Sequence, residues 1–152
     1  MDNNTDRNLV VDVKNLHISF KTFKGYSKVL NGVNLQVHKR ERIAIVGETG
    51  CGKTTTVSAI AQILAKQARI DKGEIFFNGK SVLKMNAKEL KKMRENGISI
   101  IFQDPIASLN PVFTIGNQMR EVIRYSGIDG ATDKNVQTER TIAALKETSM
   151  PD

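Results

Sequence analysis

The residues with the clearest capacity for chemistry form a glycine-rich segment. It reads Gly47-Glu48-Thr49-Gly50-Cys51-Gly52-Lys53-Thr54-Thr55 and fits the pattern G-x-x-x-x-G-K-[ST]. Because glycine carries no Cβ, such a loop can turn its N–H groups inward around a phosphate. We expect Lys53 to reach the terminal phosphates, the Thr54 hydroxyl to ligate Mg²⁺, and Thr55 to donate to the innermost phosphate. The segment therefore predicts binding of a nucleoside triphosphate.

Two flanking elements must position this loop. The apolar run 43–46 predicts a buried strand before it, and apolar residues at helical spacing follow it: Val57, Ile60, Ala61 and Leu64. The N-terminus of that helix would add free N–H groups and a partial positive charge. The alternative is a glycine-rich turn that contains a lysine by chance, and the order strand, loop, helix disfavours it.

Length and composition predict one soluble globular domain. The chain has 152 residues, of which 39% are hydrophobic and 26% charged. No apolar run approaches the roughly 18 to 20 residues that span a bilayer, and the polar residues 1–8 contain no apolar secretion segment. We therefore expect a cytoplasmic location. The single cysteine, Cys51, excludes an internal disulfide framework, and we interpret it as a small residue that fits the loop.

The formal net charge of +7 raises the question of an anionic partner. The densest basic cluster lies between Lys84 and Arg94, where a solvated helix face is the ordinary explanation. Aromatic residues make up only 5% of the chain and do not alternate with the basic residues, so a stacking platform for nucleic acid is not supported. No nucleic-acid partner is expected.

Periodicity predicts the remaining elements. Strands are expected over 9–20 and 29–37, separated by a polar loop at 21–28 and paired in an antiparallel layer. We expect a turn at 71–73, a short strand over 74–77 and a tight turn at 78–79. Helices are predicted over 87–95, after an N-cap at Thr114, and over 132–148, with a buried strand over 98–102.

Three motifs in a fixed order resemble the ATP-binding subunits of ABC transporters: the loop 47–55, the segment 73–79, and the strand that ends in Gln103-Asp104-Pro105. The stretch Ser108-Leu109-Asn110-Pro111, with Thr114 to Gln118, is similar to the branch that powers uptake of oligopeptides, dipeptides and nickel. The resemblance implies an α/β fold: a P-loop NTPase core of ABC type with an N-terminal antiparallel β layer and a helical arm. It implies ATP and Mg²⁺ as cofactors.

The resemblance also implies roles for residues outside the loop. Gln103 matches the glutamine that senses Mg²⁺ and the γ-phosphate, and the segment 104–118 would face the transmembrane permease subunit. An upstream aromatic stacks on adenine in this family, and Phe20 is the candidate, with Tyr26 as the alternative. The implied assembly is a dimer of ATP-binding subunits, peripheral on the inner face of the cell membrane.

The chain corresponds to only part of such a subunit. Residues 1–152 are expected to form a partial nucleotide-binding domain, because the signature motif and the Walker B strand with its carboxylates are absent. The family hydrolyses ATP, but without those carboxylates this chain alone is expected to be inactive. Two alternatives remain open: a non-catalytic nucleotide-binding fragment of a truncated gene, and a soluble ABC protein that acts on nucleic acid.

Overall fold

The computed structural model describes residues 8–148, without the side chain of Asn96, so most of the polar N-terminal stretch lies outside the described residues. The chain divides into two compact units, Met1–Leu90 and Lys91–Asp152. Each is considered by itself. In the described part of the chain, no helix is long and apolar enough to span a membrane.

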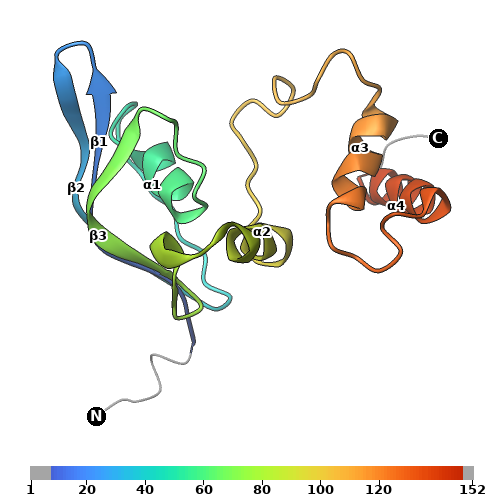
Figure 1. Cartoon of the computed structure of the whole chain (residues 1–152), viewed down its shortest axis with the longest axis horizontal. Coiled ribbons are helices and arrows are strands. Elements are labelled where there is room, and N and C mark those ends of the chain that lie inside the picture. Colours follow the sequence, from blue (N-terminus) through green and yellow to red (C-terminus); the bar gives the residue numbers. More distant parts are fainter. Residues whose placement is uncertain (1–7, 149–152) are drawn as a thin grey trace. The chain divides into compact units, whose positions relative to one another are not determined.

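The first unit is built on an antiparallel sheet with the strand order β2-β1-β3-β4 (Figure 1). Its strands are β1 (Leu9–Thr22), β2 (Gly25–His38), β3 (Ala68–Phe77) and the short β4 (Lys80–Ser81). Val13, Leu16 and Ile18 of β1 are buried in the core, and so are Leu30 of β2 and Ile75 of β3. The predicted antiparallel layer is confirmed. Residues 21–28, predicted as a loop, instead contain strand ends, and only 23 and 24 form the turn.

The predicted turn at 71–73 is wrong, because β3 runs through it without interruption. Gly73 has φ +100° and opposes a bulge in β1 at Asn15, where the pairing of β1 and β3 shifts register. A Cβ on Gly73 would lie 2.4 Å from the Asn15 carbonyl oxygen. The glycine that suggested a turn therefore permits two backbones to approach closely within the sheet.

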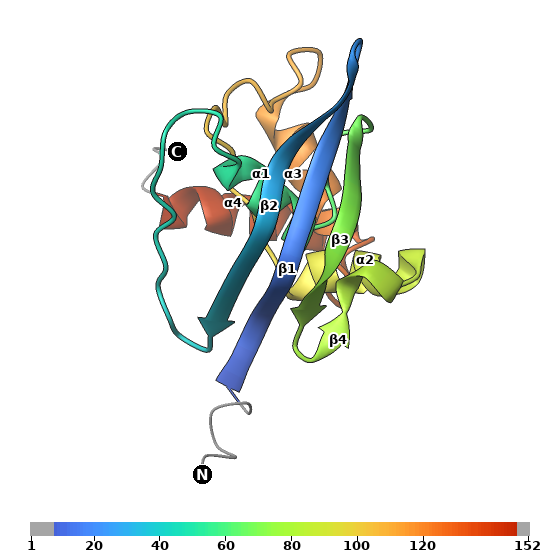
Figure 2. The same cartoon turned by 90° about the vertical axis from the view of Figure 1, so that its left-hand side faces the viewer.

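One helix and one 3₁₀ turn complete the first unit. α1 (Lys53–Ile60) lies on one face of the sheet, and Figure 2 views the sheet from the other side. η2 (Val82–Lys84) follows β4 and buries Val82. α1 ends before the predicted Leu64, because Gln62 takes φ +56° and its side chain donates to the Ala59 carbonyl.

The predicted strand over 43–46 is not formed. Residues 41–48 have no regular secondary structure, and Ile43, Ile45 and Val46 are 41%, 42% and 91% exposed. A strand requires a hydrogen-bonded neighbour, and no described residue supplies one to this segment. The same correction applies to the predicted strand over 98–102, which is also without regular structure.

The second unit is helical. α2 (Ala87–Asn96) crosses the boundary between the units and agrees with the predicted helix. α3 (Ile115–Arg124) begins at the predicted N-cap, where the Thr114 hydroxyl accepts a hydrogen bond from the Asn117 N–H. α4 (Lys134–Glu147) packs against α3 and is capped by Asp133. The α/β class with its β layer and helical arm is therefore confirmed, whereas the buried strands predicted over 43–46 and 98–102 are not formed.

Candidate nucleotide-binding site

The loop 47–55 is organised around its own lysine. Lys53 Nζ donates to the carbonyl oxygens of Gly47 at 2.8 Å and Glu48 at 2.7 Å, and lies 3.6 Å from Cys51 Sγ. The Cys51 N–H bonds the Glu48 carbonyl and tightens the turn. The loop thus encircles an ammonium group, and a phosphate placed there would find this cation at the centre of the turn.

Gly52 joins the loop to the sheet. It is the N-cap of α1, with φ +98°, and it is buried. A Cβ at this position would lie 2.5 Å from Leu30 Cδ2 and 3.3 Å from the Val29 carbonyl oxygen. Val29 is the extra residue of a bulge in β2, between the pairs Ile18↔Leu30 and Ser19↔Lys28. The bulged part of β2 therefore supports the loop, a contact that sequence spacing did not reveal.

The first turn of α1 leaves main-chain donors for a ligand. No side chain caps it, and the first helical bond runs from the Thr56 N–H to the Gly52 carbonyl. The N–H groups of Lys53, Thr54 and Thr55 accordingly have no acceptor within the helix. Thr54 is exposed, and its hydroxyl makes no hydrogen bond among the described residues, which suits a ligand of Mg²⁺. The Thr56 hydroxyl, by contrast, is buried and bonded to Gly52.

The two candidate aromatics lie on opposite faces of the sheet. Between Ile18 and Phe20, β1 pairs with β3 without interruption, so these two side chains share a face. Ile18 is the partner of Leu30, the residue against Gly52, and Phe20 is half-buried on that face. Tyr26 lies on the other face, where the Arg69 guanidinium carbon is 4.2 Å from its ring centroid. Of the two, Phe20 therefore lies on the face of the sheet that carries the loop.

Gln103 belongs to the second unit and is exposed in a segment without regular structure. Its assigned role at the nucleotide stays a prediction. In the segment 104–118, the Gln118 side-chain amide donates to the carbonyls of Asn110 and Phe113 and accepts from the Asn110 N–H. Sequence reasoning named Gln118 as part of a motif but not as this brace.

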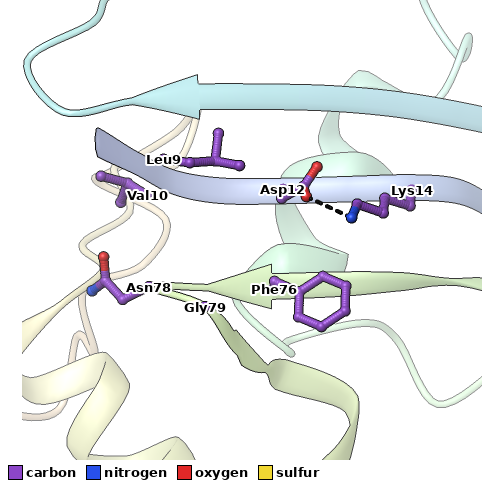
Figure 3. Close-up of a pocket in the computed structure, with 7 residues that line it drawn as sticks. All are labelled: Leu9, Val10, Asp12, Lys14, Phe76, Asn78 and Gly79. Atoms are coloured by element: carbon purple, nitrogen blue, oxygen red, sulfur yellow. Dashed lines mark ion pairs between the residues drawn. The ribbon is translucent and has the colours of Figure 1, made fainter. Parts of the chain in front are cut away.

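A cavity of about 440 Å³ opens on the first unit, and no residue of the loop 47–55 lines it (Figure 3). It lies between β1 and β3, and its charged groups neutralise each other. Lys14 pairs with Asp12 at 3.2 Å, and Asp12 also accepts from Gln36. None of the predicted site residues lines this cavity, so it does not compete with the loop as the nucleotide site.

Comparison with known proteins identifies the family. Residues 30–152 match the protein family described as ABC transporter. The dipeptide transport ATP-binding protein DppD of Lactococcus lactis subsp. cremoris is 36% identical over 143 residues, which are 94% of this chain and 40% of DppD. The oligopeptide transport ATP-binding protein OppD of Bacillus subtilis is 42% identical over 115 residues, 75% of this chain and 32% of OppD. The chain spans less than half the length of these relatives.

Solved structures share the fold. The dimeric ABC transporter cassette MJ0796 superimposes with a TM-score of 0.77 at 22% identity, over 93% of this chain and 58% of that one. CbiO1 of Clostridium perfringens, part of the ABC transporter complex cbiONQ, gives a TM-score of 0.64 at 26% identity, over 94% and 51%. The family match covers well over half of the chain, which therefore belongs to the ABC transporter family of ATP-binding proteins.

Proposed function

We propose that the chain binds Mg-ATP through the loop 47–55, as part of the nucleotide-binding domain of a subunit that energises import of peptides. The observation that carries this proposal is the position of Lys53, held at the centre of its loop beside an uncapped helix N-terminus. Several similar proteins are named as ATP-binding proteins of peptide transport, which supports peptides as the transported solute. Nickel is the remaining alternative for the solute.

The proposed roles follow from what each group offers. Lys53 exchanges its two carbonyl partners for phosphate oxygens, and the N–H groups from Gly47 to Thr55 surround the phosphates, including those of Glu48, Thr49, Gly50, Cys51 and Gly52. The Thr54 hydroxyl holds Mg²⁺, which would neutralise triphosphate charge when bound. Phe20 stacks on adenine, and Gln103 contacts Mg²⁺ and the γ-phosphate.

The proposed partners are a second ATP-binding subunit and a transmembrane permease subunit, with the protein peripheral on the inner face of the membrane. Apolar side chains are exposed throughout the segment that would meet the permease: Ile106 at 78%, Val112 at 82% and Phe113 at 56%. Monomeric soluble proteins seldom leave such groups uncovered in clusters. This exposure supports a protein partner there.

Residues 1–152 are proposed as a partial ABC-type domain without the signature and Walker B motifs. The first alternative, a non-catalytic nucleotide-binding fragment of a truncated gene, predicts ATP binding without turnover. The second, a soluble ABC protein that acts on nucleic acid, is disfavoured by the names of the similar proteins.

Calorimetric titration with Mg-ATP tests the proposal. Lys53→Ala removes the central cation of the loop and is expected to weaken binding by at least about tenfold. Lys80→Ala removes an exposed lysine of β4 and is the matched control, expected to bind as the wild type does. Equal affinities for wild type and Lys53→Ala, with both folded by circular dichroism, would overturn the assignment.

A further inference from the structure

The face of the sheet opposite α1 carries a second cavity, of about 430 Å³, around the middle of the strands. Its lining includes His17, Ser19, Tyr26, Lys28, Arg69 and Lys72. The register explains how these residues meet. Ser19 pairs with Lys28 on one side and Arg69 on the other, and His17 likewise pairs with Lys72. Figure 2 views the three strands from this face.

The cavity has an excess of positive charge. Lys28, Arg69 and Lys72 are cations, and Asp71 is the acidic residue in the lining. Asp71 is already paired, because Arg69 Nε donates to its carboxylate at 2.7 Å. That bond leaves the two terminal nitrogens of the guanidinium without a hydrogen bond among the described residues. The cavity of Figure 3 differs in this respect, because the charges of Asp12 and Lys14 neutralise each other there.

Ser19 supplies an independent observation. The residue is only 2% exposed, and its Oγ is a buried polar atom without a hydrogen-bond partner in the described part of the chain. The hydroxyl lies close enough to Asp71 to lower the pKa of that carboxyl, and the Arg69 guanidinium lowers it further, but the pair does not meet hydrogen-bond geometry. A buried hydroxyl is ordinarily satisfied, so Ser19, which lines the basic cavity and makes no fully formed hydrogen bond among the described residues, is a candidate donor to a ligand.

We propose that this cavity is a second phosphate site, distinct from the loop 47–55, in which Lys28, Arg69 and the Ser19 hydroxyl bind a phosphate group. Its donors come from three adjacent strands, and a phosphate offers enough oxygen acceptors to accept from all of them. The exposed Tyr26 ring, held by Arg69, would border the rest of a phosphorylated molecule. A free phosphate compound and a lipid headgroup share this chemistry.

Inorganic phosphate is the probe, and amide chemical shifts of the ¹⁵N-labelled chain are the readout. The titration uses the Lys53→Ala background, so that phosphate at the loop does not dominate. We expect shifts at His17, Ser19 and Arg69. Arg69→Gln should weaken binding roughly five- to tenfold. Lys80→Gln removes the same charge from β4 and should leave the affinity within about twofold, since it lies outside the cavity.

Ser19→Ala tests the hydroxyl without changing charge and should also weaken binding. If Arg69→Gln does not fold, Lys28→Gln on β2 replaces it. Cosedimentation with phosphatidylcholine vesicles, with and without phosphatidic acid, separates the two sources: retention by phosphatidic acid indicates a headgroup, and its absence a free compound. Absence of shifts on this face, or equal weakening by Arg69→Gln and Lys80→Gln, would overturn the proposal. Neither result would bear on ATP binding at the loop.

Discussion

The ammonium group of Lys53 donates a 2.7 Å hydrogen bond to the main-chain carbonyl of Glu48, five residues earlier in the chain. The loop is therefore closed on itself before any phosphate arrives. Under the proposed function, a nucleotide that takes Lys53 as its cation would break this bond and the similar one to Gly47, and the released carbonyls would rotate or bind water. The loss of these two hydrogen bonds would offset part of the attraction between Lys53 and the phosphate.

Cys51 reports this event, because it is the single cysteine of the chain and is exposed in the loop. A phosphate bound in the turn should shield the thiol. We predict that Mg-ATP slows alkylation of Cys51 by a maleimide, measured by mass spectrometry, and that Lys53→Ala abolishes the protection. Unchanged alkylation at saturating Mg-ATP would contradict the placement of phosphate in this loop.

Gly52→Ala is expected to destabilise the first unit. The substitution incurs the cost of a left-handed conformation, about 1–2 kcal/mol, and adds a clash with Leu30 worth about 1–3 kcal/mol. Gly79→Ala is the control: it also has positive φ, but nothing lies within 4 Å of its built Cβ. Denaturant unfolding should therefore show a larger decrease in the free energy of unfolding for Gly52→Ala than for Gly79→Ala. Equal losses would mean that Leu30 moves away at no cost.

Turnover of ATP by the purified chain is predicted to stay near background. The chain contains no Walker B carboxylates, and the amide of Gln103 is too weakly basic to activate water. Steady-state phosphate release measures this directly. Release that is well above background and is lost in Lys53→Ala would require a general base among residues not assigned here.

The exposed segment 43–46 is predicted to cause self-association. Extended apolar segments without a neighbouring strand pair readily with other chains. Val46→Lys should reduce association measured by light scattering, because a charge disfavours strand pairing. Val122→Lys makes the same change on the exposed surface of α3, where no strand edge exists, and should have a smaller effect. A wild-type monomer with strong amide protection over 43–46 would contradict the prediction.

The turn before this segment is predicted to loosen in acid. The Glu41 carboxylate accepts hydrogen bonds from the His38 N–H and from the His38 side chain. Both bonds hold the pKa of Glu41 below its ordinary value of 4.5, and the main-chain bond contributes more. A depressed pKa in the folded state means that the carboxylate stabilises the turn above pH 4.5 and that this is lost as the pH falls through the folded pKa. In Glu41→Gln, the protection factor of the His38 amide should no longer fall in acid. A Glu41 pKa at or above 4.5 by NMR titration would contradict the prediction.

Features that depend on near neighbours could be predicted from the sequence. The spacing of glycines, lysine and threonines predicted a tight loop ahead of α1, and Thr114 predicted the start of α3, because a cap bonds the N–H three residues on. The hairpin of β1 and β2 followed from alternation along each strand.

Features that depend on distant partners were decided only by the tertiary structure. The apolar run 43–46 has the composition of a buried strand, but a strand forms only where another backbone pairs with it. Gly73 resembled a turn residue until β1 was placed against it. Phe20 and Tyr26 could not be distinguished by composition, because the face that each occupies depends on pairing and on the bulge at Val29. Cross-strand register also brought Lys28, Ser19 and Arg69 together, since these residues share no spacing along the chain.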